Sequence, residues 1–156
     1  MTTQPQHVPT RRHRWSRARF ARFIDLPTRW DDNDAFGHVN NVKYYAFFDT
    51  AITFCEIEGG IFDLQTSPVI PYVVDSNCTY FEGVAFPEAL EVGVAIERIG
   101  NSSLTYALAV FRKGEAQPAA QGHFIHVYVD RQTERPVPLP AAVKAYAEAL
   151  SVRSDP

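Results

Sequence analysis

The stretch VNNVKYYAFFDTAITFCEIE, residues 39–58, decides the fold that we expect. Only four of its residues carry a charge, and the pair Gly59-Gly60 follows it as a stop signal for a helix. A helix that is apolar nearly all round is a buried helix. At ~1.5 Å per residue this one would be ~30 Å long, so the rest of the chain must wrap it on most sides.

The segments around this helix predict strands. Residues 89–96 and 104–112 each alternate large apolar side chains with other residues, and a Gly-Asn-Ser turn separates the two segments. Three further strands are predicted at residues 23–30, 72–81 and 119–129. Such a run of hairpins after one helix favours an antiparallel sheet over a βαβ array.

Two further features complete the predicted fold. Small residues recur within the strands, as at Gly93 and Ala107, and would let a sheet curl closely around the helix. Residues 141–150, opened by two prolines, predict a short closing helix. We therefore predict an α+β hotdog fold, in which an antiparallel sheet of about five strands wraps one long central helix, with a short C-terminal helix.

Composition sets the class of protein. The chain has 156 residues, 46% hydrophobic and 21% charged, which indicates one folded domain. Its longest uncharged stretches, such as residues 64–74, fall well short of the ~18 apolar residues of a membrane span. Two cysteines, Cys55 and Cys78, are too few for a disulfide scaffold and lack metal-ligand spacing. We expect two reduced core thiols in a cytoplasmic protein with no metal site and no membrane contact.

Charge is divided unevenly along the chain. Residues 1–22 hold six Arg and no acid, whereas the rest holds nine Lys and Arg against eighteen Asp and Glu. Because residues 1–22 show no clean apolar period, we expect a disordered tail there, a domain at residues 23–150 and a disordered end at 151–156. A solvated tail, an arm that contacts phosphates and a targeting segment all stay open, although nucleic-acid binding is not our expectation. We expect residues 1–19 to be dispensable for chemistry.

The segment WDDNDAFGHVNNVKY, residues 30–44, holds the densest cluster of polar functional groups in the chain. Its Asp34 precedes a helix that we expect to begin near Asn40 or Asn41, and the first N–H groups of a helix lack internal partners. A carboxylate and such donors can activate water, or attack a carbonyl, and stabilise the oxyanion that develops. The alternative is that Asp34 and the asparagines only cap the helix.

The spacing D-x-D-x-x-G-H-V-N-N-x-x-Y over residues 32–44 resembles the signature of hotdog-fold acyl-CoA thioesterases of the 4-hydroxybenzoyl-CoA thioesterase type. Residues 99–104 resemble that family's turn between middle strands, and residues 135–140 its lead into the last helix. The resemblance covers roughly residues 23–150. It implies an acyl-CoA thioesterase that releases a carboxylic acid and CoA without a metal or organic cofactor, assembled as a homodimer or homotetramer.

The resemblance also assigns roles to residues. It implies that Asp34 is the catalytic carboxylate, that the backbone N–H of Asn41 is the oxyanion donor and that Gly37 is the close-approach position. His38 can be a general base, a partner that orients the loop or a packed residue. Related acyl-carrier-protein thioesterases use Asp-x-Asn-x-His, and Phe36 stands in the Asn place here, which weakens a shared Asp–Asn–His machinery.

Other residues of the segment have two interpretations each. The aromatic side chains of Phe36 and Tyr44 are candidate walls of the substrate site, but core packing explains them as well. Asp32 is expected to be a structural partner rather than a second acid. The three carboxylates of the long helix are expected to pack or to end the helix.

Elsewhere the polar residues suggest no second site. His123 and His126 lie three apart on a strand and so face opposite sides, which excludes joint metal ligation. There is no glycine-rich phosphate loop, so CoA phosphates would meet scattered cations. The sequence cannot rank these candidates, which are Arg98, Arg112, Lys113 and Arg131.

Three other functions stay open. An acyl-carrier-protein thioesterase is one, although the acidic body argues mildly against an acidic carrier. A non-hydrolytic acyl-CoA binding module is another. A hotdog dehydratase is the third, and it would need an acid–base pair such as His38 with an acid. The length of the acyl chain cannot be read from the sequence.

Overall fold

A computed structural model describes residues 13–153. The elements are β1 (Arg22–Pro27), α1 (Lys43–Glu58), β2 (Val69–Tyr80), β3 (Ala89–Ile99), β4 (Ser103–Arg112), β5 (Ala120–Asp130) and α2 (Ala141–Ala149), with short 3-10 helices η1 (Arg17–Arg19) and η2 (Trp30–Asp32). The strands form one five-stranded sheet in the order β1-β3-β4-β5-β2, and all neighbours are antiparallel. The predicted α+β hotdog fold is confirmed.

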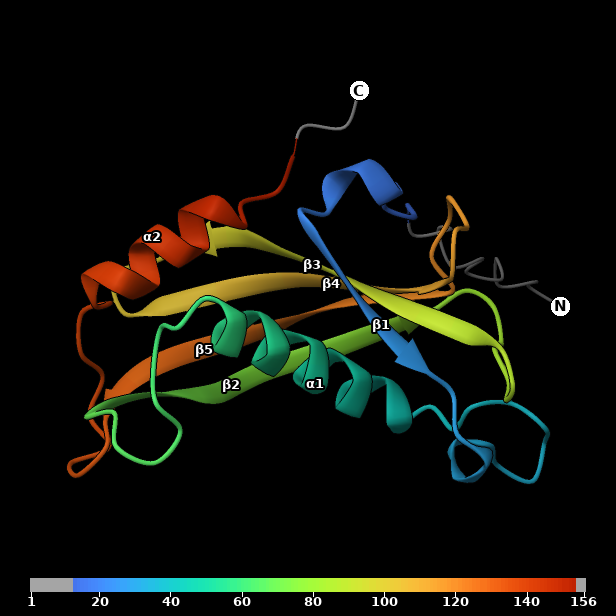
Figure 1. Cartoon of the computed structure of the whole chain (residues 1–156), viewed down its shortest axis with the longest axis horizontal. Coiled ribbons are helices and arrows are strands. Elements are labelled where there is room, and N and C mark those ends of the chain that lie inside the picture. The colour runs from blue at the N-terminus through green and yellow to red at the C-terminus, as the bar shows by residue number, and fades with distance from the viewer. Residues whose placement is uncertain (1–12, 154–156) are drawn as a thin grey trace, which may run out of the picture.

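The core lies between α1 and the face of the sheet that α1 crosses (Figure 1). Phe48, Ala51 and Ile52 of α1 are fully buried there, together with Val94 of β3 and Leu108 of β4. These strand residues are the large members of the alternation in the sequence, because a period of two places alternate side chains on one face. Each large apolar side chain so buried contributes about 1.5–3 kcal/mol.

The helix α1 begins at Lys43, two to four residues later than the predicted start at residues 39–41. Local hydrogen bonds explain the difference. The Val39 N–H donates to the Val84 carbonyl (2.7 Å), and Asn40 accepts the Lys43 N–H with its own carbonyl (2.9 Å). Residues 39–42 are therefore a connection tied to another loop, and not the first turn of the helix.

One side of α1 is not covered by any of residues 13–153. Phe54 is 49% exposed and Ile57 is 52% exposed, and both border a shallow hollow together with Thr53. The expectation that the sheet wraps the helix on most sides is therefore met only in part within a single chain.

The N-terminal segment, residues 13–21, packs on the face of the sheet opposite α1, and this corrects the prediction of a disordered tail up to residue 22. Phe20 is only 2% exposed and packs with Ala95 and Ala107. A Cβ added to Gly93 would lie 2.7 Å from the Phe20 ring. The small strand residues therefore make room for Phe20, and not for the helix as we expected.

The Arg residues of this region meet carboxylates of the rest of the chain. The four ion pairs are Arg14–Glu82 (2.5 Å), Arg19–Glu97 (2.6 Å), Arg22–Glu58 (2.8 Å) and Arg17–Glu91. The positive charges of these four Arg are therefore compensated by negative charges of the rest of the chain. Arg11 and Arg12 lie outside the described residues, as does the rest of the predicted tail at residues 1–12.

The C-terminal residues pair with the backbone of β3, where Ser151 forms a parallel bridge with Ile96. The Val152 N–H donates to the Ile96 carbonyl (2.9 Å), and the Arg153 N–H donates to the Arg19 carbonyl (3.0 Å). Residues 151–153, predicted to be disordered, are therefore bonded to β3 and to the N-terminal segment, while residues 154–156 lie outside the described part. None of the helices within residues 13–153 has both the length and the apolar character needed to cross a membrane.

Candidate active site

Asp34 starts a tight turn in the loop between η2 and α1. Its N–H donates to the His38 carbonyl (2.9 Å), its carbonyl accepts the Gly37 N–H (3.1 Å), and its carboxylate Oδ1 accepts the Phe36 N–H (2.8 Å). Gly37 has φ +84°, where glycine is favoured, and an added Cβ would meet nothing within 4 Å. The carboxylate oxygen Oδ2 has no hydrogen-bond partner within residues 13–153, so it is left to solvent or a ligand.

The structure does not support a capping role for Asp34. The residue that precedes α1 is Val42, which makes no side-chain cap. The side-chain hydrogen bond at this helix end comes from Asn40, whose Oδ1 accepts the Val42 N–H (3.1 Å). Asp34 stabilises its own turn instead, so its second carboxylate oxygen has no structural task among the described residues.

Asp32 is a structural residue, as the sequence predicts. It is 4% exposed, and its Oδ2 accepts the Arg29 N–H at the start of η2 (2.7 Å). Its carbonyl accepts the Asn40 N–H (2.8 Å), and Lys43 Nζ lies 3.5 Å from its Oδ1. Asp32 therefore joins the two ends of the loop.

Asn41 lies exposed just before α1. Its carbonyl accepts the hydroxyl of Tyr80 at the end of β2 (2.9 Å), which fixes this part of the chain. The Asn41 N–H has no hydrogen-bond partner in the part of the chain that the structure describes. It is thus a free donor of the kind that a developing oxyanion needs, although it precedes the first turn of α1.

His38 and Val39 rest on the loop of residues 82–88, which joins β2 to β3. The Val39 N–H bonds to the Val84 carbonyl, and the His38 ring packs so closely on Gly83 that an added Cβ would lie 2.7 Å from ring atom Cδ2. His38 as a whole is an exposed residue. Among the described residues, Asp34 contacts the backbone of His38 rather than its ring, and the two side chains form no hydrogen bond or ion pair with each other.

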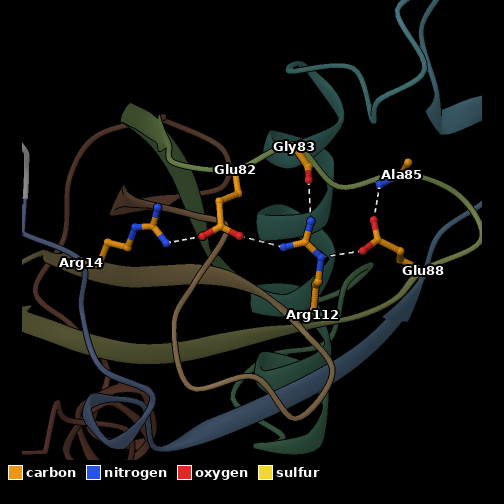
Figure 2. Close-up of polar contacts among 6 residues, drawn as sticks. All are labelled: Arg14, Glu82, Gly83, Ala85, Glu88 and Arg112. Atoms are coloured by element: carbon orange, nitrogen blue, oxygen red, sulfur yellow. Dashed lines mark hydrogen bonds and ion pairs between the residues drawn. The ribbon is translucent and has the colours of Figure 1, made fainter.

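A polar network holds the loop of residues 82–88 (Figure 2). Arg112, the last residue of β4, donates to Glu88 Oε1 (2.5 Å), to Glu82 Oε2 (2.9 Å) and to the Gly83 carbonyl (2.6 Å). Glu88 in turn accepts the Ala85 N–H with its other oxygen (2.6 Å). The guanidinium of Arg112 therefore holds the loop by three hydrogen bonds.

Arg14 extends this network to the N-terminal segment by donating to Glu82 Oε1 (2.5 Å). The hydrogen bonds from Arg14 and Arg112 lower the pKa of Glu82. Burial raises the pKa of Glu88, but the hydrogen bonds from Arg112 and from the Ala85 N–H outweigh it, so the pKa is lowered. Both carboxylates are therefore ionised near neutral pH, and Arg112 faces two negative charges.

Sequence reasoning missed this network. Its members come from the N-terminal segment, from the loop of residues 82–88 and from the end of β4, so no local motif contains them. The sequence held one indication of the network. The predicted hairpin of residues 89–96 and 104–112 places the end of its second strand beside the start of its first. In the structure Arg112 lies opposite Leu90, next to Glu88.

The two aromatic candidates lie in different surroundings. Phe36 is 87% exposed at the tip of the Asp34 turn. Tyr44 is buried, and its ring meets the Tyr80 ring edge-on at 5.0 Å. Burial raises the pKa of Tyr44. Phe36 is thus placed to contact a ligand, whereas Tyr44 supports the start of α1 from the core.

A second polar cluster surrounds Glu56 near the other end of α1. Glu56 is 3% exposed, its Oε1 accepts the Tyr106 hydroxyl (3.1 Å), and His126 Nδ1 lies 3.6 Å from the same oxygen. The hydroxyl of Tyr146 lies 3.2 Å from that of Tyr106. Glu56 and His126 also border a hollow of about 310 Å³ beside β2. Glu56 thus packs, as predicted, but within a polar cluster rather than an apolar core.

The two strand histidines face opposite sides of the sheet, as predicted. His126 points toward α1, whereas His123 pairs with Asp75 through Nε2 (2.8 Å). Within residues 13–153, no cluster of three or more His, Cys, Asp or Glu side chains is arranged to hold a metal ion. Both cysteines are free thiols, and burial raises the pKa of Cys55 and of Cys78 to about 11.

The four candidate cations for CoA phosphates differ in their partners and in their distance from the Asp34 loop. Arg112 bonds to Glu82 and Glu88, and Lys113 pairs with Asp25 (2.8 Å), so carboxylates already compensate both charges. Arg98 lies near the end of β3 and Arg131 just after β5, at the opposite end of the sheet from the Asp34 loop. Within a single chain, none of the four is an uncompensated cation beside Asp34.

Comparisons with known proteins agree with this fold. The sequence profile of the "Thioesterase-like superfamily" matches residues 28–146. The crystal structure of the PA5185 protein of Pseudomonas aeruginosa PAO1 is similar, with a TM-score of 0.88 and 45% identity over 92% of this chain and 100% of that one. The uncharacterized protein YsmA of Bacillus subtilis is 28% identical over 76% of this chain and 79% of its own. Slr0204 of Synechocystis, a 1,4-dihydroxy-2-naphthoyl-CoA thioesterase, has a TM-score of 0.73 at 16% identity over 80% of this chain and 93% of its own, which indicates a shared fold.

Proposed function

Because the chain belongs to the thioesterase-like superfamily, we propose that it hydrolyses acyl-CoA thioesters to a carboxylic acid and CoA at the loop of residues 31–42. One observation carries the proposal. Asp34 offers a carboxylate oxygen without a structural partner, on the same exposed loop as the unpartnered N–H of Asn41, within the described residues.

The proposed reaction uses these two groups. Asp34 takes a proton from water while the water oxygen adds to the thioester carbonyl carbon. The carbonyl oxygen becomes an oxyanion and accepts the Asn41 N–H. Collapse of the intermediate re-forms the carbonyl and breaks the carbon–sulfur bond, and the CoA thiolate takes up a proton. In the nucleophilic variant, Asp34 itself attacks, CoA leaves, and water hydrolyses the resulting anhydride.

The remaining loop residues have supporting roles in this proposal. The open space beside Gly37 admits the substrate, and the exposed Phe36 ring contacts it. Tyr44 shapes the site from behind rather than as an exposed wall. His38 orients the loop, because its backbone carbonyl holds Asp34 while its ring lies on Gly83.

We also propose that the protein is at least a dimer. The strand β2 is an edge of the sheet and exposes Tyr72, Val73 and Val74, and α1 exposes Phe54 and Ile57. An edge strand with unpaired backbone groups and apolar neighbours is stabilised by pairing with a second copy. Sedimentation at micromolar protein should therefore show a species heavier than the 17.6 kDa chain, and a 17.6 kDa species alone would exclude the dimer.

The alternatives remain an acyl-carrier-protein thioesterase, a binding module and a dehydratase. The missing contact between the Asp34 carboxylate and the His38 ring gives no support to an acid–base dyad of the kind that a dehydratase needs. The excess of acidic residues after position 22 favours CoA over an acidic carrier protein only mildly. No feature of the loop selects an acyl length.

Release of free thiol from a panel of acyl-CoAs and matching acyl-carrier-protein thioesters tests the proposal. We expect thiol and carboxylic acid in equal amounts from at least one acyl-CoA, at a higher kcat/KM than from the carrier-protein thioester. A binding module or a dehydratase would leave every thioester intact. A higher kcat/KM for the carrier-protein thioesters would instead identify the protein as an acyl-carrier-protein thioesterase.

A further inference from the structure

We propose that Arg112 is a positioning residue for the Asp34 loop, and that Arg14 of the N-terminal segment acts through it. The inference rests on the proposed function, because positioning matters for catalysis only if the loop of residues 31–42 carries the chemistry. It replaces our expectation that residues 1–19 are dispensable.

The guanidinium of Arg112 is suited to its three acceptors (Figure 2). Its Nε, Nη1 and Nη2 each donate to a different group, which are the carboxylates of Glu88 and Glu82 and the carbonyl of Gly83. A planar fork with fixed donor directions can hold three acceptors at once, whereas a lysine ammonium acts as a compact point charge on a flexible stem. Arg112 therefore fixes where the loop of residues 82–88 lies.

The loop of residues 82–88 in turn contacts the residues that hold Asp34 in place. Gly83 supports the His38 ring, and the Val84 carbonyl accepts the Val39 N–H (2.7 Å). The His38 carbonyl accepts the Asp34 N–H (2.9 Å). A continuous chain of hydrogen bonds and close packing thus runs from Arg112 to the turn that presents the Asp34 carboxylate.

Arg14 connects the N-terminal segment to the same chain of contacts. It bonds to the Glu82 oxygen that Arg112 leaves free, and its guanidinium lies 4.7 Å from the centre of the Phe81 ring. Two hydrogen bonds hold this part of the segment on β5, because Gln121 accepts the Trp15 N–H (2.8 Å) and donates to the His13 carbonyl (2.9 Å). Glu82 is therefore held from both sides.

The exposure of these groups predicts a local rather than a global effect. The side chain of Arg112 is 32% exposed and that of Glu82 is 46% exposed, and ion pairs at such positions contribute little to overall stability. Catalysis is more sensitive, because a misplacement of about 1 Å can cost on the order of 10²-fold in rate. Loss of the network should therefore change turnover more than melting temperature.

The first experiment compares Arg112→Met and Arg112→Lys with Arg17→Met in the full chain. Arg17 is a matched control because its side chain is 33% exposed and pairs with Glu91, and among the described residues it forms no hydrogen bond, ion pair or ring contact with residues 82–88. We expect Arg112→Met to lower kcat about tenfold with KM within about twofold. Arg112→Lys should have a kcat between those of Arg112→Met and wild type. Arg17→Met should keep the wild-type kcat even if its melting temperature falls below that of Arg112→Met.

The second experiment compares Arg14→Met with Arg19→Met. Both Arg residues lie in the N-terminal segment, pair with one glutamate and lie over one aromatic ring. Only the partner of Arg14 bonds to Arg112. We expect Arg14→Met to lower kcat about threefold and Arg19→Met to leave it unchanged, since a purely structural role would affect the two variants alike.

A third measurement does not depend on activity. Amide hydrogen exchange of Val39 reports the bond to the Val84 carbonyl, and amides of β4 report global opening. In Arg112→Met, the Val39 amide should exchange at least fivefold faster than in wild type while the β4 amides keep their rates. Unchanged Val39 exchange, or an unchanged kcat in Arg112→Met, would overturn the inference. If the wild type releases no thiol from any acyl-CoA, the proposed function fails, and the Val39 exchange still decides whether Arg112 holds the loop.

Discussion

The loop before α1 and the last turn of α1 each hold a carboxylate that could serve chemistry, and the surroundings of the two carboxylates are opposite. Asp34 lies in a turn just before the helix, with one carboxylate oxygen free of partners among the described residues. Glu56 is 3% exposed near the end of the helix and is bonded to Tyr106 beside His126. Burial and bonding within the fold occupy the Glu56 carboxylate, whereas Asp34 keeps one oxygen without a structural partner among the described residues. For this reason we propose Asp34, rather than Glu56, as the reactive acid.

Asp34→Asn should give the largest effect. The change keeps the side-chain volume and the hydrogen bond from the Phe36 N–H, but it removes the charge that we propose activates water. We expect turnover to fall ~10²–10⁴-fold with little change in melting temperature. Both are measured on the same preparation. A folded variant within about threefold of wild type would remove Asp34 from the mechanism and move the assignment to His38.

Glu56→Ala should affect stability instead. Removing the Glu56 carboxylate takes the acceptor away from the buried Tyr106 hydroxyl, so we expect a loss of about 1–3 kcal/mol in the free energy of unfolding. Turnover should stay within about twofold where the variant is folded. Glu58→Ala on the same helix removes only an exposed pair with Arg22, and it should cost less than about 1 kcal/mol. A loss of turnover in Glu56→Ala without loss of stability would reverse the comparison.

His38→Ala should lie between these extremes for activity. The imidazole packs on Gly83 and orients the loop, so its removal should lower turnover about tenfold rather than a thousandfold. The check is kcat across pH values from 5 to 9. If His38 were the general base, the variant would instead lose as much turnover as Asp34→Asn.

Asp32→Asn should change turnover far less than Asp34→Asn and His38→Ala. Its carboxylate accepts the Arg29 N–H and lies near Lys43, which is a structural role. We expect a loss of about 0.5–2 kcal/mol in stability, as for a lost cap, and turnover within about threefold of wild type. Thermal unfolding and initial rates measured together separate the two effects. A drop in turnover comparable to that of Asp34→Asn would mean that both acids take part.

The fold was predictable where the pattern is local. Alternation in residues 89–96 and 104–112 predicted the faces of β3 and β4, and the apolar run at residues 39–58 predicted α1. The N-terminal segment was not predictable in this way. Phe20 is buried only because Gly93, Ala95 and Ala107, distant in sequence, leave room for it.

The same distinction holds at the site. Asp34, Gly37 and Asn41 lie within one short segment, so a local family resemblance could imply a carboxylate and an N–H donor there. The Arg112 network joins residues from positions 14 to 112 through tertiary packing, and no spacing rule contains it. The start of α1 was misplaced for a related reason, because the Val39 N–H bonds to Val84 in a separate loop.

The central claim is that this chain adds water to the acyl carbon of a thioester by means of Asp34. It is tested most directly by incubating wild type and Asp34→Asn with an acyl-CoA in H₂¹⁸O, and measuring free thiol and the isotope content of the acid. We expect wild type to release thiol and acid in equal amounts, with ¹⁸O in the acid, and Asp34→Asn to do so ~10²–10⁴-fold more slowly. Intact thioester with wild type, or equal rates of labelled acid formation by the two proteins, would contradict the account.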